Sequence, residues 1–374
     1  MTKIVGTIGA VLKLTNIVVV LFYLSACLIP ILPAGQFWMI AMLGLVFPLL
    51  FVVVTVFFAG WLIAGSKWCL LSLIALLLSW QQLAVIAGLN TKKTFSVEKP
   101  KQILRVLTWN ISSWSETSKN YKPNAGNLTK MIMAIKDQAP DIICLQEFWD
   151  KRGDFSNTKV FSAIGYPYSY FIHSTLGDMV YESGVAILSK YPITDTARFT
   201  YGANTDFAEP LIYADIQFNE QKVRVFTTHL ESVRFENDQY VALRKIKQRD
   251  EEGLKNSKTI VRKLKNGYMY RGFQADLVRQ KIKESPYPVI VCGDFNDVPN
   301  SYTYFTIKGD LKDVFLNKGT GLGRTFQYLS PTLRIDYILV DKNFEVKQFD
   351  RMSATYSDHF PIVADLSLPS KKKQ

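Results

Sequence analysis

Acidic residues are missing from the first quarter of this 374-residue chain. There is no Asp or Glu between Met1 and Val97, and the only charged side chains in that stretch are five lysines. These lysines account for +5 of the net charge of +12, which leaves +7 for Glu98–Gln374. The change in composition excludes one uniform soluble domain and indicates a membrane segment joined to a water-soluble domain.

Three apolar runs fill the part without acidic residues, at Leu14–Leu32, Phe37–Leu62 and Trp68–Gly88. Each meets or approaches the roughly 20 residues that a helix needs to cross a bilayer. We therefore predict three transmembrane α-helices within an anchor of residues 1–89. A cleaved signal peptide would explain the first run but not the next two. The runs contain no Asp, Glu, Arg or His, so nothing in them suggests a proton or ion path.

Basic residues near the ends of the runs help to predict which side of the membrane carries the soluble domain. Lys3, Lys13 and Lys67 favour the cytoplasm for the N-terminus and for the second connection, because cytoplasmic loops are rich in Lys and Arg. Three crossings then predict a multi-pass integral protein of the inner (cell) membrane with its soluble domain in the periplasm. Five basic residues after the third run favour the cytoplasm instead: Lys92, Lys93, Lys99, Lys101 and Arg105.

Cysteine and histidine are also scarce, with four and three residues respectively. No two cysteines stand close enough in the sequence to form a zinc or redox motif. We interpret all four cysteines as small buried apolar residues. Two of the three histidines, His229 and His359, stand at predicted strand ends, which sets them apart from an isolated core histidine.

The soluble part begins with a polar linker, residues 90–102, and continues as a domain over residues 103–369. Short apolar runs rich in β-formers recur in that domain, with fewer helix-like stretches such as Leu128–Gln138 and Asn300–Ile307. Many strands with few helices predict an α/β fold in which two sheets pack as a sandwich. Residues 370–374 form a short basic tail.

One segment of the soluble domain, Ser232–Glu284, is strongly basic, with 14 Lys or Arg against 7 Asp or Glu. Its net charge of +7 equals the whole excess of the soluble part. The spacing of its apolar residues predicts helices, with a break at "NGYMYRG" (Asn266–Gly272). Two interpretations stay open: a solvated helical insertion, and a basic surface that faces phosphate groups or an anionic bilayer.

Polar residues crowd the predicted strand ends. The strand "VIVC" runs into a turn with Asp294, Asn296 and Asp297, and ordinary turn chemistry is one explanation of this group. Similar residues recur at other strand ends, however: Asn110, Glu147, His229, Asp336, Asp358 and His359. Because strand ends at one edge of a sheet are where α/β proteins build sites, we expect these side chains to form one site.

The set consists of carboxylates, carboxamides and imidazoles and singles out no nucleophilic Ser or Cys. It suits hydrolysis by water with the help of Mg²⁺ or Mn²⁺. Glu147 and Asp358 offer the hard oxygen ligands that these ions prefer, and Asp294 is a candidate base for the attacking water. His229 and His359 are able to stabilise the charge that builds up on phosphate oxygens.

Seven stretches, in their order along the chain, resemble the endonuclease/exonuclease/phosphatase superfamily with its deoxyribonuclease-I-like fold: "LTWNI", "DIICLQE", "SGVAILS", "TTHL", "VCGDFND", "RIDYIL" and "YSDHFPIVADL". The resemblance spans Ile103 to Leu368, and the ordered set is far more specific than any single member. The layout of three apolar helices before this domain further resembles an uncharacterised membrane-anchored group found in Bacteroidetes.

The resemblance implies a role for each motif residue. Glu147 would bind the catalytic metal, with Asp358 near it and Asn110 assisting the placement of metal or phosphate. Asp294 would position the nucleophilic water, and Asn296 would contact the scissile phosphate.

The resemblance also implies two imidazole–carboxylate pairs. Asp336 would orient His359, which would contact the phosphate. His229 resembles the second histidine of the nuclease and sphingomyelinase branches, and Glu182 is the candidate carboxylate beside it. An exposed edge residue is the other interpretation of Glu182.

The implied activity is that of a membrane-anchored phosphoester hydrolase dependent on Mg²⁺ or Mn²⁺, with a phosphodiesterase or endonuclease as the first expectation. The basic insertion suits nucleic acid, whereas the anchor suits a phospholipid or sphingomyelin phosphodiesterase. Inositol phosphate monoesters come third, because "DVPNSYTY" replaces the extra basic motif of that branch. A non-catalytic membrane scaffold is the alternative of another class. The expected partners are the lipid bilayer and a phosphodiester substrate, and no protein partner is expected.

Overall fold

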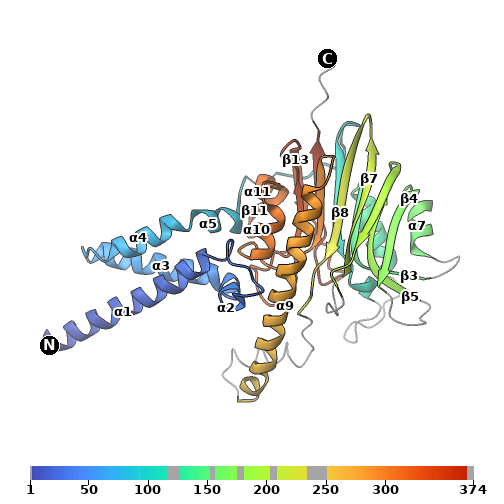
Figure 1. Ribbon diagram of the computed structural model, residues 1–374. Coiled ribbons are helices and arrows are strands. Elements are labelled where there is room, and N and C mark those ends of the chain that lie inside the picture. Colours follow the sequence, from blue (N-terminus) through green and yellow to red (C-terminus); the bar gives the residue numbers. More distant parts are fainter. Residues whose placement is uncertain are drawn as a thin grey trace. The chain divides into compact units, whose positions relative to one another are not determined.

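The computed structural model describes residues 2–91, 93–115, 127–151, 156–174, 181–202, 209–233 and 251–368 (Figure 1). The chain divides into two compact units. The first, which we call the anchor unit, comprises Met1–Ile86, Val233–Gly272 and Val298–Thr306. The second, which we call the sandwich unit, comprises Ala87–Ser232, Phe273–Asp297 and Ile307–Gln374. The N-terminal helices therefore share a unit with two segments from much later in the chain.

Five helices form the N-terminal part of the anchor unit: α1 (Thr2–Cys27), α2 (Trp38–Ala41), α3 (Leu43–Ile63), α4 (Cys69–Leu78) and α5 (Trp80–Ile86). Among the described residues, two helices are long and apolar enough to cross a membrane, over Thr7–Cys27 and Leu43–Ile63. The third predicted run is not one straight helix, because α4 and α5 are bent by 63° at the break between them. The apolar composition of that run gives no sign of the break.

The basic segment contains one helix of 33 residues, α9 (Glu251–Lys283). The predicted break at Asn266–Gly272 is wrong, since α9 continues through both glycines of that stretch. Gly267 is buried, and a Cβ there would lie 2.9 Å from a guanidinium nitrogen of Arg271. A glycine inside a helix costs about 1 kcal/mol relative to alanine, and burial of the neighbouring Tyr268 offsets that cost.

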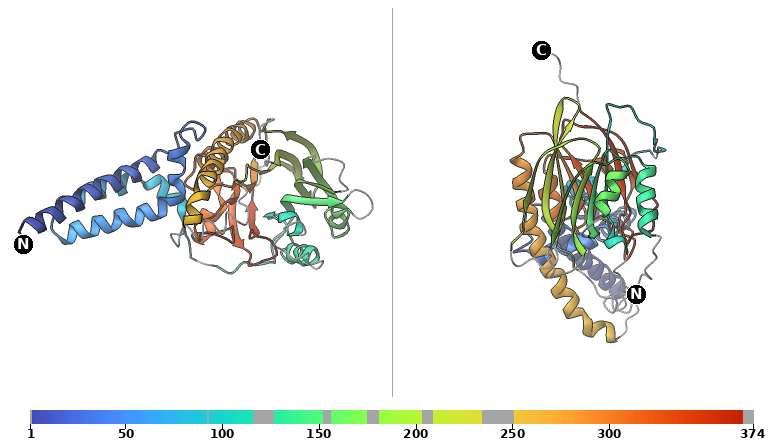
Figure 2. Two further views of the ribbon diagram at one scale, coloured as in Figure 1. Left: turned by 90° about the horizontal axis from the view of Figure 1, so that it is seen from below. Right: turned by 90° about the vertical axis from the view of Figure 1, so that its right-hand side faces the viewer.

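Two six-stranded sheets form the sandwich unit (Figures 1 and 2). The first sheet has the order β10 (Lys312–Asp313), β12 (Asp336–Val340), β9 (Val289–Asp294), β8 (Gln221–His229), β7 (Glu209–Phe218) and β6 (Ile193–Phe199). The second has the order β13 (Glu345–Arg351), β14 (Ile362–Ser367), β2 (Leu104–Asn110), β3 (Ile142–Lys151), β5 (Tyr181–Ser189) and β4 (Tyr168–Ser174).

Shorter elements complete the described chain. A small sheet pairs β1 (Gly88–Leu89) with β11 (Thr320–Gly321). The other helical elements are η1 (Ser112–Ser115), α6 (Asn127–Asp137), α7 (Asn157–Ala163), α10 (Tyr302–Lys308) and α11 (Val314–Lys318). Helices α6 and α10 lie where the sequence predicts helices.

The core of the sandwich unit lies between the two sheets. Fully buried side chains from both inner faces pack there, including Val106, Cys144 and Ile187 from the second sheet and Val225 and Cys292 from the first. Burial of apolar surface contributes about 25 cal/mol per Å², so this layer provides the main driving force for joining the sheets. The prediction of an α/β sandwich of two packed sheets is confirmed.

The segment after α5, residues 90–102, makes fixed contacts within the sandwich unit. Asn90 donates from Nδ2 to the carbonyl oxygens of Leu316 at 3.0 Å and Gly319 at 2.9 Å. The ammonium group of Lys99 lies 2.8 Å from Oδ2 of Asp141. These contacts tie both ends of the segment to the sandwich.

Candidate active site

The first sheet brings four ionisable side chains to one end of its central strands. Strands β8 and β9 run parallel and end together, so His229 and Asp294 are register partners. Strands β7 and β12 run antiparallel to them and begin at the same end, where Glu209 pairs with His229 and Asp336 with Asp294. Asp336 therefore begins a strand, whereas His229 and Asp294 end theirs.

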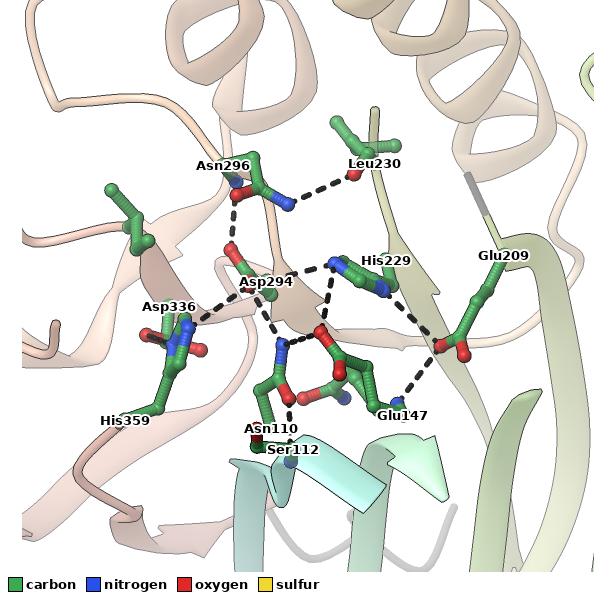
Figure 3. Close-up of polar contacts among 12 residues, drawn as sticks. Asn110, Ser112, Glu147, Glu209, His229, Leu230, Asp294, Asn296, Asp336 and His359 are labelled. Carbon is green, nitrogen blue, oxygen red and sulfur yellow. Dashed lines mark hydrogen bonds and ion pairs between the residues drawn. The ribbon is translucent and has the colours of Figure 1, made fainter. Parts of the chain in front are cut away.

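The second sheet adds Asn110, the last residue of β2, and Glu147 on β3 (Figure 3). The pairing of β3 with β5 shifts between Leu145 and Phe148, and Glu147 has a φ of 50°. Such a bulge redirects a side chain and is common beside active sites. Asn110 donates from Nδ2 to Oε1 of Glu147 at 3.2 Å and to Oδ2 of Asp294 at 3.0 Å. Its carboxamide thus joins the two sheets.

Asp294 lies at the centre of this cluster and is 1% exposed. Its Oδ1 accepts the backbone N–H of Asn296 at 2.8 Å, and its Oδ2 lies 3.8 Å from Nε2 of His229 and 3.6 Å from Nε2 of His359. Burial and the charge of Asp336 raise the pKa of Asp294 to about 6, although the two imidazoles act in the opposite direction. The carboxyl group therefore gains or loses its proton close to neutral pH.

His359 is fixed through both its ring and its backbone. Its Nδ1 lies 2.9 Å from Oδ2 of Asp336, and its carbonyl oxygen accepts the indole N–H of Trp109 at 2.9 Å. The ring packs edge-on against Phe326, with the centroids 5.0 Å apart. Burial lowers the pKa of His359, but the charges of Asp336 and Asp294 outweigh burial and raise this pKa well above its usual value. The ring therefore lies between two carboxylates that favour its protonated form.

His229 stands on the other side of Asp294. Its Nδ1 lies 3.3 Å from Oε2 of Glu209, as an ion pair without the alignment of a hydrogen bond. Its Nε2 lies 3.8 Å from carboxylate oxygens of both Glu147 and Asp294. Burial disfavours the proton on His229, but the contact with Glu209 and the three nearby carboxylate charges raise its pKa to about 9.

Glu209 is the site residue that sequence reasoning missed. Its Oε2 also accepts the backbone N–H of Glu147 at 3.0 Å, so one carboxylate contacts His229 and supports the bulge. Only strand register could have revealed it, because Glu209 begins the strand antiparallel to the one that His229 ends. Glu182 lies on β5 opposite Asp150, and its side chain lies outside the described residues.

Asn296 and Asp358 have neighbours of their own. Asn296 has a φ of 51° and donates from Nδ2 to the carbonyl oxygen of Leu230 at 2.9 Å, which fixes the turn after β9. The carboxylate of Asp358 accepts the Ser357 hydroxyl at 3.2 Å. Within the described part of the chain, no hydrogen bond or ion pair joins Asp358 to Glu147.

Two groups of side chains have the chemistry to hold a divalent cation. Asp294, Asp336 and His359 place ligand atoms within 4.8 Å of one another, but all three are buried and His359 already supplies a positive charge. Glu147 differs, because its side chain is 32% exposed and open to an ion from solvent. Its carboxylate offers hard oxygen donors and leaves coordination positions for water. Asn110 turns its Nδ2 toward this carboxylate, and its Oδ1 accepts the backbone N–H of Ser112. The residues at Glu147 therefore fit Mg²⁺ or Mn²⁺.

Comparison with known proteins defines the class. The model of the endonuclease/exonuclease/phosphatase family matches residues 107–359, which is more than half of the chain. The chain therefore belongs to this family, whose members hydrolyse phosphoester bonds. A second model, described as a domain of unknown function, matches residues 9–86. No curated protein matches the chain.

Solved structures share the fold. The human Nocturnin catalytic domain with bound sulfate anion has a TM-score of 0.52 at 20% identity, covering 72% of this chain and 94% of that one. The endonuclease/exonuclease/phosphatase from Bacteroides vulgatus has a TM-score of 0.50 at 21% identity, with coverages of 71% and 99%. The one from Beutenbergia cavernae has a TM-score of 0.50 at 19% identity, with coverages of 71% and 72%.

Proposed function

We propose that this chain is a membrane-anchored phosphodiesterase that hydrolyses its substrate with water and a divalent cation. The observation that carries the proposal is the setting of Asp294, which has a pKa of about 6 and lies between His229 and His359. A carboxylate with that pKa accepts a proton from an attacking water at neutral pH. The two imidazolium rings would stabilise the negative charge that develops on the phosphate oxygens.

The metal-binding residues in this proposal are Glu147 and Asn110, with Asp358 near the ion. When bound, Mg²⁺ or Mn²⁺ polarises a phosphoryl oxygen and stabilises transition-state charge by several kcal/mol. Asn296 would use the second N–H of its carboxamide to bind the phosphate, since the first is bonded to Leu230. These side chains bind and orient the phosphate, while Asp294 takes the proton from water.

Glu147→Gln tests the metal assignment, because it keeps the shape of the side chain and removes its charge. We expect hydrolysis to fall sharply at limiting Mg²⁺ and to recover in part at high Mg²⁺. The matched control is Glu98→Gln, an exposed acid in the segment that precedes β2, whereas Asn110 is the last residue of that strand. Near-normal turnover of Glu147→Gln at limiting Mg²⁺ would remove Glu147 from the metal site.

Nucleic acid is the first substrate class, because the chain belongs to a family that includes endonucleases and carries a basic helix. A phospholipid or sphingomyelin is the second, and one observation within the anchor unit favours it. Val298–Thr306 directly follows the Asp294–Asn296 turn in sequence and packs with the apolar helices. Gly44 of α3 approaches Asn300 so closely that a Cβ on Gly44 would overlap the Asn300 carbonyl oxygen.

A substrate panel separates these classes. Purified chain with Mg²⁺ is assayed on plasmid DNA, RNA, sphingomyelin, phosphatidylinositol phosphates and a generic phosphodiester ester. Cleavage of a phosphodiester that disappears in Asp294→Asn supports the proposal, and the preferred substrate assigns the class. If intact wild-type chain cleaves none of the panel with Mg²⁺ or Mn²⁺, the non-catalytic scaffold becomes the better interpretation.

Our proposal includes three membrane crossings, with α4 and α5 together forming the third. Its support is a set of hydrogen bonds between α1 and the α4–α5 pair at a nearly constant sequence offset: Asn16 with Ser72, Tyr23 with Ser79, and Cys27 with Gln82, at separations of 56, 56 and 55 residues. A constant offset means that the pair runs parallel to α1 (Figure 1). The shared stretch covers about 16 Å, which is about half the thickness of the hydrocarbon core.

The break at Ser79 is compatible with a membrane crossing, because its polar groups are satisfied. The Ser79 hydroxyl bonds with Tyr23 and donates to the carbonyl oxygen of Leu76 at 2.8 Å. Non-helical backbone is tolerated at membrane depth when neighbouring helices supply such partners. A parallel third crossing brings the chain out on the side where α1 ends.

Labelling of single cysteines tests this topology in a chain whose native Cys27 and Cys69 are replaced by alanine. The exposed residues Gln36, Ala64 and Thr91 are changed to cysteine one at a time and treated with a membrane-impermeant maleimide. We expect Gln36→Cys and Thr91→Cys to react from the periplasm and Ala64→Cys from the cytoplasm. Reaction of Thr91→Cys from the same side as Ala64→Cys would mean that α4 and α5 do not cross.

A further inference from the structure

The central half of α9, Lys258–Gly272, is a cationic stretch of helix within the anchor unit. Lys258–Gly272 has five basic residues and no acidic one. Lys258 and Arg262 are exposed and stand four residues apart, which places them on the same face of the helix. Among the described residues, neither has an ion-pair partner. We call this surface, defined by Lys258 and Arg262, the cationic face of α9.

Further along the same half-helix, Tyr268 and Gly272 pack on the connection between α1 and α3. Tyr268 is 2% exposed and shares a buried cluster with Ala34 and Ala41. A Cβ on Gly272 would lie 3.3 Å from the Cβ of Ala34, so the helix backbone rests directly on that connection. The half-helix is therefore attached to the segment that follows the first apolar span.

This attachment places the half-helix at the depth of lipid head groups. The first apolar span ends at Cys27 and the second begins at Leu43, so a membrane crossed by both helices would leave the connection between them just outside the hydrocarbon. The connection contains Trp38. The ammonium group of Lys265 lies 5.3 Å from the centre of the Trp38 ring. Tryptophan is enriched at that interface, and a cation over its face is attracted by the ring electrons.

We propose that the cationic face of α9 binds the head groups of anionic phospholipids in the membrane that α1 and α3 span. This inference rests on the membrane anchoring in the proposed function, but it does not depend on the activity of the site. Basic residues near an anionic leaflet each gain about 1 kcal/mol from the surface potential. The two exposed cations have no described carboxylate to satisfy them, whereas the phosphates of the bilayer lie at the same level.

A lipid surface fits this face better than nucleic acid does. Lys258 and Arg262 belong to the same helix as Tyr268, which packs on the connection between the two apolar spans, so the chain itself keeps these charges near the bilayer. A nucleic acid would have to approach that same plane against the repulsion of anionic lipid. Phosphate chemistry is shared by both partners, but only the bilayer is held next to the helix by the chain itself.

The test measures lipid retention in the full chain. Wild-type protein is placed in nanodiscs of mixed phosphatidylcholine and phosphatidylglycerol, released, and its bound lipids are counted by native mass spectrometry. The variant combines Lys258→Gln with Arg262→Gln, and the matched control combines Lys318→Gln with Lys342→Gln, two exposed lysines of the sandwich unit. We expect the variant to lose about 30-fold in preference for phosphatidylglycerol, with the control unchanged.

Two further measurements distinguish a failure of the lipid proposal from a failure of the proposed hydrolysis. Lipid retention in Asp294→Asn should equal that of wild type, so a failure of the proposed hydrolysis would leave this result intact. The same proteins in nanodiscs of phosphatidylcholine alone are titrated with a labelled oligonucleotide. Equal phosphatidylglycerol preference in wild type and variant would overturn the proposal. Loss of oligonucleotide binding without loss of lipid preference would assign the cationic face of α9 to nucleic acid instead.

Discussion

His359 and His229 flank Asp294 on opposite sides, and each has a carboxylate at its Nδ1, but the two carboxylates do different work (Figure 3). Asp336 contacts only the ring of His359, and its Oδ1 has no hydrogen-bond partner among the described residues. Glu209 contacts the ring of His229 and also accepts the backbone N–H of Glu147. A change at Asp336 should therefore act on His359 and, through its charge, on the pKa of Asp294, whereas a change at Glu209 should reach the proposed metal site.

The largest effect is expected at Asp294, which lies between the two imidazole–carboxylate pairs. Asp294→Asn removes the proposed base and the negative charge that both imidazoles share. Loss of a general base typically costs 10²–10⁴-fold, so we expect kcat to fall by about 10³-fold with little change in KM. Single-turnover hydrolysis at saturating Mg²⁺ measures this effect. A fall of less than tenfold would show that another group takes the proton from water.

The pair formed by Asp336 and His359 should behave as one functional group. Removing the imidazole with His359→Ala is expected to cost about 10² in kcat, and Asp336→Asn should cost most of that, since residues that act as a unit are not additive. The double variant should then be no worse than His359→Ala. Measured kcat values for the three variants decide this, and fully multiplicative losses would show that the two residues act independently.

The sequence predicts one of the two imidazole–carboxylate pairs and not the other, because only one of them stands in local sequence motifs. Asp336 and His359 stand in motifs that are readable locally, so the sequence alone predicts their pairing. Glu209 stands in no such motif, because its relation to His229 comes from the register of β7 against β8. Long-range register is a tertiary property, and neither composition nor local spacing encodes it in a readable form.

The secondary structure likewise contains elements that the sequence predicts and elements that it does not. Buried strands such as β9 appear in the sequence as apolar runs, so the sequence predicts them. Strands β6 and β13 are partly exposed and interrupted by polar residues, so no apolar run marks them. The break between α4 and α5 is hidden for another reason, since apolar residues stand on both sides of Ser79 and no Gly or Pro marks the break.

Glu209→Gln should give a smaller loss than Asp336→Asn but a different pattern. The amide can still accept the N–H of Glu147, so we expect kcat to fall only about tenfold, while the Mg²⁺ concentration for half-maximal activity rises several-fold, as outer-shell changes do. Asp336→Asn should leave that Mg²⁺ requirement unchanged. Titration of activity with Mg²⁺ measures both variants.

Glu182→Gln is the matched control for Glu209→Gln. It tests the carboxylate that the sequence offers as the partner of His229. We expect Glu182→Gln to have near-normal activity and Mg²⁺ requirement. If Glu182→Gln raised the Mg²⁺ requirement and Glu209→Gln did not, the role assigned to Glu209 would be wrong.

The smallest expected effect is a shift in the pH profile. Its direction tests whether His229 carries a positive charge. Asp294 must be ionised to accept a proton, so kcat/KM should fall as the pH drops through about 6, the raised pKa of this carboxyl group. Protonated His229 lowers the pKa of Asp294, and Glu209 helps to keep His229 protonated by raising its pKa to about 9. In Glu209→Gln the ring should lose its proton more easily, because burial then dominates. The pKa of Asp294 should rise in consequence, and the acid limb should move to higher pH by a fraction of a unit.

A bound cation lowers the same pKa, so all profiles are recorded at saturating Mg²⁺ and compared with that of Glu182→Gln. A limb that moves to lower pH in Glu209→Gln would mean that His229 does not carry the charge that the contact with Glu209 assigns to it.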